Sequence, residues 1–411
     1  MREITTVVCD DDPTGTQSAS GVPVLLRTDR PQLAAAVRAH DALYVQTNSR
    51  ALPERDAVEL VARVRHEVLE TAAGPVRFVL RGDSTLRGHV FPEIDVFAAV
   101  DGVVLFVPAF PAGGRTTRGG VHYVRQGDHD VPAGETEYAR DPVFGFRSSS
   151  LVDYVAEKSG RRGVAVPLEQ VREPGGLARA LLQAPAGAVV VPDVVSESDV
   201  DLVHAGLLEA ERAGREVLVR CGAPLAARCA GAASTGLLTT PVQRPAGPVL
   251  VVCGSHTAGA TAQLAELEPI TGPPVVLGTA TAIAAPERAA EDVLGPLWDR
   301  LASGVAVLCS ERDRAAEHGT LEHGRRVMAG LTTAVHRLSG ELALVVAKGG
   351  ITSAEVATAG LGAESAVVRG QILPGISLYD LAPHPVPQVV VPGNVGSART
   401  LVEVLAATGA A

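Results

Sequence analysis

The sequence lacks the cysteine spacings, long apolar runs and basic surplus that mark several classes of protein. Its five cysteines are scattered and form no CxxC pair, which argues against a disulfide framework and a structural zinc site. No run of about 18 or more apolar residues appears, so no transmembrane helix is predicted. A formal net charge of −10 argues against nucleic acid as a partner, because phosphate backbones bind basic surfaces.

Several catalytic signatures are missing as well. There is no GxxxxGK[ST] loop, and no GxGxxG opens a helix after a strand, which argues against a Walker-type NTPase and a dinucleotide-binding fold. The histidines form no HExxH or HxH pair, and no GxSxG elbow occurs, so neither a zinc hydrolase nor a serine hydrolase is indicated.

The composition is that of a globular protein with a large core. The chain has 411 residues, of which 46% are hydrophobic, 20% charged and only 3% aromatic, and this length predicts two or three domains. The N-terminus enters a strand-like run at once, without an apolar signal core, so we expect a cytoplasmic protein that does not bind membranes.

Strand-like and helix-like runs alternate along the chain. The clearest helix is expected over 53–71, where Ala57, Val61, Val64 and Val68 recur at helical spacing. Short apolar strands between helices predict an α/β fold whose mainly parallel sheets are flanked by helices. We expect these strands at 5–9, 42–46, 76–80, 102–107, 163–166, 187–191, 216–219, 248–253, 274–277, 304–308, 341–347 and 388–391.

Residues 232–248 show no alternation of strand-like and helix-like runs, and they are rich in Thr, Pro and Gly. They predict a boundary between two domains, 1–235 and 245–411. The stretch 108–147 is poor in regular pattern and dense in Gly, Pro and Arg. Long irregular segments of this kind are often functional.

The stretch VVCDDDPTGT places three carboxylates, Asp10, Asp11 and Asp12, at the end of the first apolar run. Asp is depleted from strands and adjacent negative charges repel, so strand formation does not explain them. Either they belong to a solvated turn, or they face a site that meets a cation, a hydroxyl proton or an arginine.

Two further polar clusters follow strands in the first half. The loop RGDSTLRGH carries Arg81, Asp83, Ser84 and Arg87, and the loop GRTTR begins at Gly114 with Arg115 next. Arginine suits bidentate capture of a carboxylate, although a local ion pair such as Arg87 with Asp83 is the plainer alternative. Because all three clusters follow strands, we expect them to meet at one edge of one sheet.

Three small-residue turns follow strands in the second half, at 254–257, 348–353 and 392–396. Turns between a strand and a helix leave backbone N–H groups that suit an anion, so these three turns point to a nucleotide or phosphate site. The run Thr352-Ser353-Ala354-Glu355 predicts a capping box at the helix start.

Six motifs in order resemble the four-carbon acid sugar kinase family, whose members have a sugar-acid-binding N-terminal domain and a nucleotide-binding C-terminal domain. The matches span nearly the whole chain. They are DDPTG (11–15), RGDSTLRG (81–88), PAFPAGGRTTRGGVHYV (108–124), GSHT (254–257), KGGITSAEVA (348–357) and PGNVG (392–396). Arg81 stands where the family more often has Lys, and Asp10 and Pro13 also depart from its usual opening.

The resemblance implies ATP-dependent phosphorylation of a terminal hydroxyl of a four-carbon acid such as threonate, erythronate or 3-oxo-tetronate, with the active site in the cleft between the domains. It also implies Mg²⁺ with the ATP, and a homodimer is possible in such a family. The implied catalytic residues are Asp11 and Asp12, and the implied substrate-binding residues are Arg81, Asp83, Ser84, Arg87 and Arg115. The implied nucleotide-binding residues are Ser255, Gly349, Gly350, Ile351, Thr352, Ser353 and Gly393.

Two other functions use the same features. An NAD-dependent dehydrogenase of small hydroxy acids would also need Gly turns and arginines, but the missing GxGxxG counts against it. A non-catalytic sensor of sugar acids would need only the first-half cluster, so the complete set of Gly turns in the second half favours the kinase.

Overall fold

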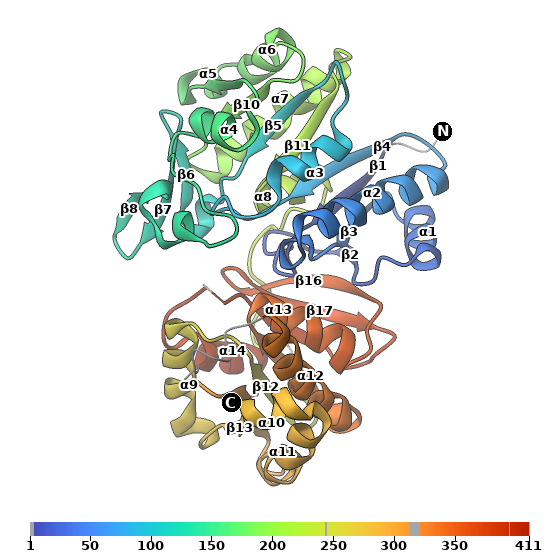
Figure 1. Cartoon of the computed structure of the whole chain (residues 1–411), viewed down its shortest axis with the longest axis vertical. Coiled ribbons are helices and arrows are strands. Elements are labelled where there is room, and N and C mark those ends of the chain that lie inside the picture. Colours follow the sequence, from blue (N-terminus) through green and yellow to red (C-terminus); the bar gives the residue numbers. More distant parts are fainter. Residues whose placement is uncertain (1–3, 243–244, 313–320, 394, 411) are drawn as a thin grey trace. The chain divides into compact units, whose positions relative to one another are not determined.

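The computed structural model describes residues 4–242, 245–312, 321–393 and 395–410 (Figure 1). Its contacts divide the chain into two compact units, Met1–Ala233 and Ser234–Ala411, and we describe each by itself. Within the described ranges, no helix is both long enough and apolar enough to cross a membrane.

The first unit is built on a sheet of eight parallel strands in the order β2-β3-β1-β4-β11-β5-β10-β9. The strands are β1 (Thr5–Asp10), β2 (Val22–Leu25), β3 (Ala42–Gln46), β4 (Val76–Arg81), β5 (Val103–Val107), β9 (Gly163–Val166), β10 (Val189–Pro192) and β11 (Val217–Cys221). The helices are α1 (Arg30–Ala39), α2 (Glu54–Thr71), α3 (Val90–Phe97), α4 (Leu151–Ser159), α5 (Leu168–Arg172), α6 (Gly176–Gln183), α7 (Glu197–Arg212) and α8 (Ala223–Cys229).

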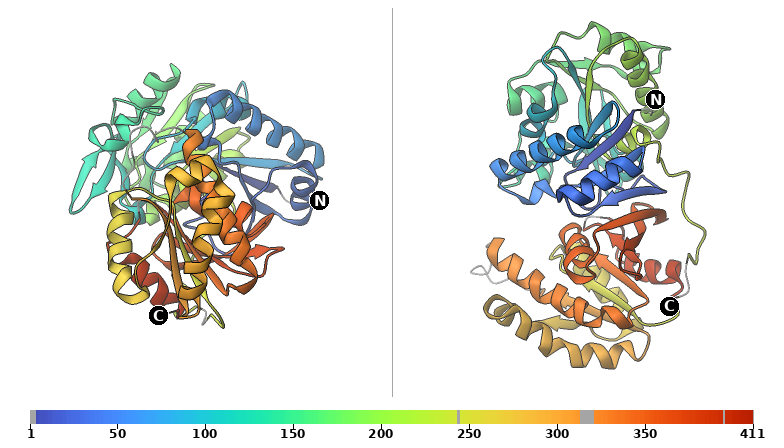
Figure 2. Two further views of the ribbon diagram at one scale, coloured as in Figure 1. Left: turned by 60° about the horizontal axis from the view of Figure 1, so that its bottom comes forward. Right: turned by 90° about the vertical axis from the view of Figure 1, so that its right-hand side faces the viewer.

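Helices flank this sheet in two groups (Figures 1 and 2). Helices α1, α2 and α3 pack against one another, as do α6, α7 and α8. The expected helix over 53–71 is confirmed as α2, and its predicted apolar positions are buried. Both faces of the sheet are therefore covered, which explains why its strands are almost wholly apolar.

The interval 108–147 is more regular than its composition indicates. It contains a three-stranded antiparallel sheet of β6 (Arg115–Arg118), β7 (Val121–Gln126) and β8 (His129–Pro132), with short 3-10 turns around it. The turn between β6 and β7 uses Gly119 and Gly120, both with positive φ. Our interpretation of this interval as irregular was wrong because its strands are only four to six residues long and largely polar, so they carry no clear apolar alternation.

The second unit has a seven-stranded sheet in the order β13-β14-β12-β15-β18-β17-β16. The first five strands are parallel, whereas β17 runs antiparallel to both of its neighbours. The strands are β12 (Val249–Cys253), β13 (Val275–Leu277), β14 (Val305–Ser310), β15 (Leu344–Lys348), β16 (Ser365–Leu373), β17 (Ile376–Ala382) and β18 (Gln388–Val391). The helices are α9 (Ala258–Thr271), α10 (Thr279–Ala284), α11 (Pro286–Leu301), α12 (Leu321–Leu338), α13 (Gly350–Glu355) and α14 (Thr400–Thr408).

The predicted α/β architecture with mainly parallel sheets is confirmed, and six strands are added to those expected. The sequence analysis did not identify β2, β6, β7, β8, β16 or β17. The strands β16 and β17 form a hairpin in which buried and exposed residues alternate, unlike the continuous apolar runs of the parallel strands. All five cysteines are buried and free, as expected of small apolar residues.

Candidate active site

The polar clusters of the first unit meet where neighbouring parallel strands end. Asp10, the last residue of β1, lies in register with Gln46 of β3 and with Arg81 of β4. Arg81 in turn lies in register with Cys221 of β11. The expected convergence of the 10–16 and 81–89 clusters at one sheet edge is therefore found in the structure.

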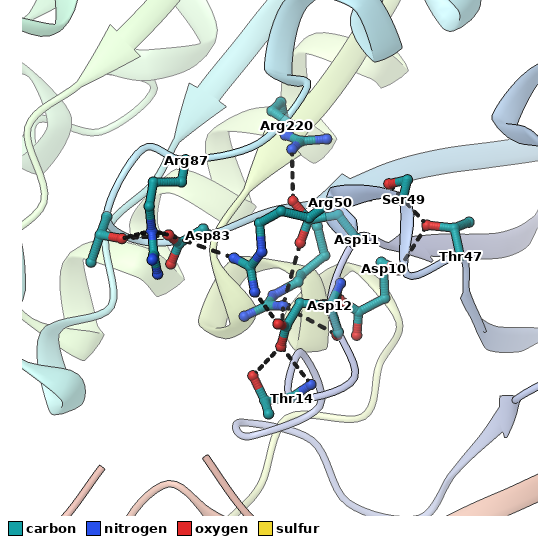
Figure 3. A network of polar contacts seen from close by, with 12 residues as sticks. Asp10, Asp11, Asp12, Thr14, Thr47, Ser49, Arg50, Asp83, Arg87 and Arg220 are labelled. Carbon is teal, nitrogen blue, oxygen red and sulfur yellow. Dashed lines mark hydrogen bonds and ion pairs between the residues drawn. The ribbon is translucent and has the colours of Figure 1, made fainter. Parts of the chain in front are cut away.

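Each of the three consecutive carboxylates lies against an arginine, and Figure 3 shows Asp12 beside Arg50 and Asp11 beside Arg220. Arg81 is nearest to Asp10 and also lies 3.7 Å from Asp11 and 4.0 Å from Asp12. Successive side chains of an extended chain point to opposite faces of a sheet. Asp10 accordingly meets Arg81, Asp11 meets Arg220 of β11, and Asp12 meets Arg50, which follows β3. Arg81 ends β4, Arg220 lies in β11 and Arg50 follows β3, so only the assembled sheet brings them to the aspartates.

Asp10 is buried, and its Oδ1 lies 3.0 Å from Nη1 of Arg81. A Cβ added to Gly15 would lie 1.9 Å from Oδ2 of Asp10, so the glycine leaves the space that this carboxyl group occupies. Burial raises the pKa of Asp10 from 3.8 to about 7, although Arg81 acts in the opposite direction.

Asp11 belongs to a buried chain of charges on the side of α3. Its Oδ2 lies 3.2 Å from Nη2 of Arg220, whose Nη1 donates to Glu93 of α3. Glu93 also accepts a hydrogen bond from Ser49. Burial raises the pKa of Asp11 against the attraction of Arg50 and Arg220. Its Oδ1 has no hydrogen-bond partner among the described residues.

Asp12 is the most accessible of the three carboxylates, with 13% of its side chain exposed against 2% for Asp11 and 3% for Asp10. Its Oδ1 accepts the backbone N–H of Thr14 at 2.8 Å and also the Thr14 hydroxyl, and its Oδ2 is paired with Arg50. Burial acts to raise the pKa of Asp12, but Arg50 and Arg81 hold it below its usual value.

The loop after β4 carries a second set of ion pairs. Nε of Arg87 lies 2.8 Å from Oδ2 of Asp83, and the Arg87 guanidinium lies over the ring of Tyr138. Asp83 also accepts from Thr85 and lies 3.5 Å from Arg50. Against the effect of burial, Arg50 and Arg87 lower the pKa of Asp83. The local ion pair considered for Arg87 is thus present, while 26% of its side chain remains exposed.

The third cluster reaches the same loop through a histidine. His122 of β7 is buried between the hydroxyl of Thr117, at 3.0 Å, and the carbonyl oxygen of Ser84, at 2.8 Å. Burial lowers the pKa of His122 to about 4, so the ring is neutral at physiological pH. Arg115 opens β6, is half-buried and donates to the carbonyl of Gly113.

In the second unit, the three glycine turns come together at the carboxyl ends of β12, β15 and β18. A Cβ built on Gly349 would lie 3.3 Å from Cβ of Ser255. One built on Gly393 would lie 3.6 Å from the Ser255 hydroxyl oxygen and 4.0 Å from Cα of Gly349. The hydroxyl of Thr257 donates to the carbonyl of Gly393 at 3.4 Å. These residues form a small cradle of backbone and hydroxyl groups.

Helix α13 starts in this cradle, but without the predicted capping box. It begins at Gly350 with Gly349 as its N-cap, so Thr352 and Ser353 lie inside the helix. Both are buried, and Ser353 donates to the carbonyl oxygens of Ala347 and Gly349. Ile351 is 53% exposed. The prediction of a capping box was wrong because the helix starts earlier than expected. Gly349, with φ of 114°, ends the strand three residues before Thr352.

The third turn differs from the expected strand–turn–helix pattern. Strand β18 ends at Val391, and α14 begins only at Thr400, with Arg399 as its N-cap. Gly393 therefore contributes to the cradle from a longer connection and not from a helix start. Lys348, the last residue of β15, is buried near this connection. Its ammonium group donates to the carbonyl oxygens of Pro392, at 2.8 Å, and Val395, at 3.4 Å.

Sequence reasoning missed Ser49, Arg50 and Arg220 of the first-unit network. It considered Glu93 only as a local ion-pair partner of Arg81 or Arg87, whereas Glu93 pairs with Arg220. Arg220 had a signal, because a charge within the apolar run EVLVRC must find a buried partner. Arg50 lies in a connection without Gly-rich or other motif character, and its role depends on contacts with Asp12 and Asp83.

Comparison with known proteins agrees with this arrangement. Residues 6–229 match a family described as a sugar-binding N-terminal domain, and residues 250–401 match a nucleotide-binding C-terminal domain. A D-threonate kinase of Bordetella bronchiseptica is 35% identical over 363 residues, covering 84% of this chain and 77% of that protein. The chain therefore belongs to the four-carbon acid sugar kinase family, which confirms the resemblance found in its motifs.

A second relative and a solved structure support the same assignment at different levels. A D-erythronate kinase of Heliobacterium modesticaldum is 32% identical over 234 residues, which are 56% of this chain and 50% of that protein. The crystal structure of a Haemophilus influenzae protein of the DUF1537 family has a TM-score of 0.69 at 18% identity and covers 98% of this chain and 100% of its own. That structure supports the fold alone.

The raised pKa of Asp10 predicts how stability depends on pH. The pKa of Asp10 is 3.8 in the unfolded chain and about 7 in the folded protein. The contribution of protonated Asp10 to the free energy of unfolding is therefore complete below about pH 4 and is lost as the pH rises through 7. We expect Asp10→Asn to match the wild type in urea unfolding near pH 4 and to be more stable than it near pH 8. Asp101→Asn, on an exposed loop, controls for the loss of one charge. An Asp10→Asn variant less stable than the wild type near pH 8 would contradict this.

Proposed function

We propose that this protein is an ATP-dependent kinase that phosphorylates a terminal hydroxyl of a four-carbon sugar acid of the threonate, erythronate or 3-oxo-tetronate class. The observation that carries the proposal is Asp12, the most accessible carboxylate at the end of β1, held by Arg50 and Thr14 beside a group of arginines. The relatives named as D-threonate and D-erythronate kinases support the substrate class.

The substrate hydroxyl is proposed to bind at Asp12. A carboxylate with a lowered pKa is a weak proton acceptor, but it orients a hydroxyl well, and phosphoryl transfer depends mostly on positioning and charge neutralisation. Asp11 is too buried to meet a substrate directly, and its pairing with Arg220 makes it a supporting residue behind Asp12. This division of roles follows from the exposure of the two side chains.

The substrate carboxylate is proposed to bind among the arginines that keep part of their side chains exposed. Arg87 and Arg50 are 26% and 18% exposed, and Arg115 is half-buried. Arg81 is only 6% exposed and is directed at Asp10, so we propose that it orients that carboxylate instead of binding the substrate. Asp83 and Ser84 lie on the same loop and would bind substrate hydroxyls.

The nucleotide is proposed to bind in the cradle of the second unit, at Ser255, Gly349, Gly350, Ile351, Thr352, Ser353 and Gly393. The cradle fits phosphate oxygens because glycines leave its backbone open and hydroxyl groups surround it. ATP supplies the phosphoryl group for the reaction. The match of this unit to a nucleotide-binding domain supports the assignment.

Mg²⁺ with the ATP remains a prediction. Within the described part of the chain, no group of three or more His, Cys, Asp or Glu residues is arranged to hold a metal ion. The acidic cluster at Asp10, Asp11 and Asp12 is matched by arginines and does not fit a metal site of its own. We therefore assign no protein ligands to the ion and no step to it.

The role of Asp12 is tested by Asp12→Asn in an assay of ADP release over a panel of four-carbon acids. If Asp12 holds the attacking hydroxyl, kcat should fall by roughly 10²–10⁴-fold while ATP binding is preserved. Asp11→Asn should also reduce kcat, but less. Asp141→Asn is the matched control, because Asp141 likewise accepts backbone N–H groups of its own turn. Full activity of Asp12→Asn would leave the DDD turn without a catalytic role.

The carboxylate site is tested by Arg87→Ala. Loss of a charge-assisted hydrogen bond, worth on the order of 1.5–3 kcal/mol, should raise KM for the acid far more than KM for ATP. Arg161→Ala is a close control, because Arg161 also pairs with one aspartate and is 25% exposed. Reduced thermal stability with normal kinetics would show that Arg87 has only a structural role.

The cradle is tested by Gly393→Val. The new Cβ would make an ordinary contact of 3.6 Å with Ser255, so the fold should survive, but the branched side chain would fill space that a phosphate needs. ATP affinity measured by calorimetry should fall sharply. Gly295→Val, on the exposed surface of α11 with nothing within 4 Å of its Cβ, is the control. Unchanged ATP affinity in a folded Gly393→Val protein would exclude this cradle.

A further inference from the structure

Arg312 brings a guanidinium group to the nucleotide cradle from a neighbouring strand. It follows β14, which pairs with β12 so that Cys309 lies in register with Cys253. Nη2 of Arg312 donates to the carbonyl oxygen of Ser255 at 2.6 Å. Arg312 is thus attached to the turn that contributes the Ser255 hydroxyl to the cradle, although it is part of none of the recognised motifs.

Further contacts fix the plane of this guanidinium. Nη2 and Nε of Arg312 both donate to the hydroxyl of Thr261 on α9, at 2.9 and 3.2 Å. Its Nη1 is shielded from solvent and has no hydrogen-bond partner in the described part of the chain. No carboxylate of the described residues forms an ion pair with Arg312, whereas Arg50, Arg81 and Arg220 of the first unit each have one. Burial raises the pKa of the Cys253 thiol, and the charge of Arg312 and a side-chain hydrogen bond from it act against that rise. The contacts of Arg312 are therefore with neutral oxygens and a thiol, and its Nη1 has no oxygen acceptor among the described residues.

The groups that form the described part of the cradle are uncharged. Its walls are glycines, Ser255, Thr257 and Thr352, all of them neutral. Lys348 is close by, but its ammonium group is buried and directed at the carbonyl oxygens of Pro392 and Val395. A polyphosphate carries several negative charges, and its transfer chemistry relies on their neutralisation.

We propose that Arg312 binds a phosphate group of the nucleotide through its guanidinium group, whose Nη1 has no partner among the described residues. This inference rests on the proposed function, because it assumes a nucleotide in the cradle. A guanidinium suits the task because it stays charged and presents several N–H donors in one plane. The bonds to Ser255 and Thr261 would hold that plane in place before the nucleotide arrives, which reduces the entropy lost on binding.

The test is calorimetry on the full chain with ATP, ADP and adenosine as probes. Arg312→Gln should weaken ATP and ADP binding by about 10- to 100-fold, the usual effect of losing one charge-assisted hydrogen bond, and should leave adenosine binding unchanged. Arg312→Lys, which keeps the charge, should recover part of the affinity. Arg326→Gln is the matched control, because Arg326 of α12 likewise donates to neutral oxygens, the carbonyl oxygens of Ile283 and Ala284, and forms no ion pair with a carboxylate of the described residues.

The outcomes separate this proposal from the one on which it rests. Arg312→Gln with wild-type affinity for ATP would overturn the role of Arg312 and leave the cradle intact. An equal loss of ATP and adenosine binding, with a lowered Tm, would show that Arg312 only supports the Ser255 turn, and would also overturn the proposal. A wild-type protein that binds no ATP at all would instead overturn the proposed nucleotide function.

Discussion

The first unit depends on one constraint, which is that its buried carboxylates and guanidinium groups must neutralise one another. Removing such charges from water costs several kcal/mol per ion, and only close pairing and hydrogen bonding repay it. Asp10, Asp11 and Glu93 are nearly inaccessible, and each is paired with Arg81 or Arg220. Arg81 also lies 3.7 and 4.0 Å from Asp11 and Asp12, so it keeps ionised partners when Asp10 is neutral. Loss of Arg220 would instead leave Asp11 and Glu93 without their buried partner, so the network holds the carboxyl ends of β1, β4 and β11 in a single arrangement.

This constraint also explains the glycines of the first-unit motifs. A Cβ on Gly15 would overlap the Asp10 carboxyl group, and a Cβ on Gly82 would lie 2.5 Å from Nη2 of Arg220. These glycines are therefore needed for space between side chains and not for unusual backbone angles. The open side of the network contains Asp12, Arg50 and Arg87, whose partly exposed groups are available to a ligand.

The two units handle negative charge by different physical means. The first surrounds its acidic residues with arginines, so a sugar acid would meet guanidinium groups already oriented by aspartates. The second provides neutral backbone and hydroxyl groups at the ends of parallel strands, where glycines permit close approach. Arg312 adds a charge to this neutral cradle. Such a division suits a reaction in which one substrate is a small acid and the other a polyphosphate.

The sequence by itself determined the parallel α/β architecture and the helix α2, because continuous apolar runs and helical periodicity are local properties. Ordered motifs also singled out Asp11, Asp12, Arg87 and the glycine turns as candidate site residues. Only the tertiary structure decided which arginine each aspartate meets, since Arg50, which follows β3, and Arg220, in β11, are far from the aspartates in the sequence. It also decided that Arg81 is buried and that Arg312 reaches the Ser255 turn. Contacts between separate strands depend on register and sheet order, which no local pattern of residues encodes.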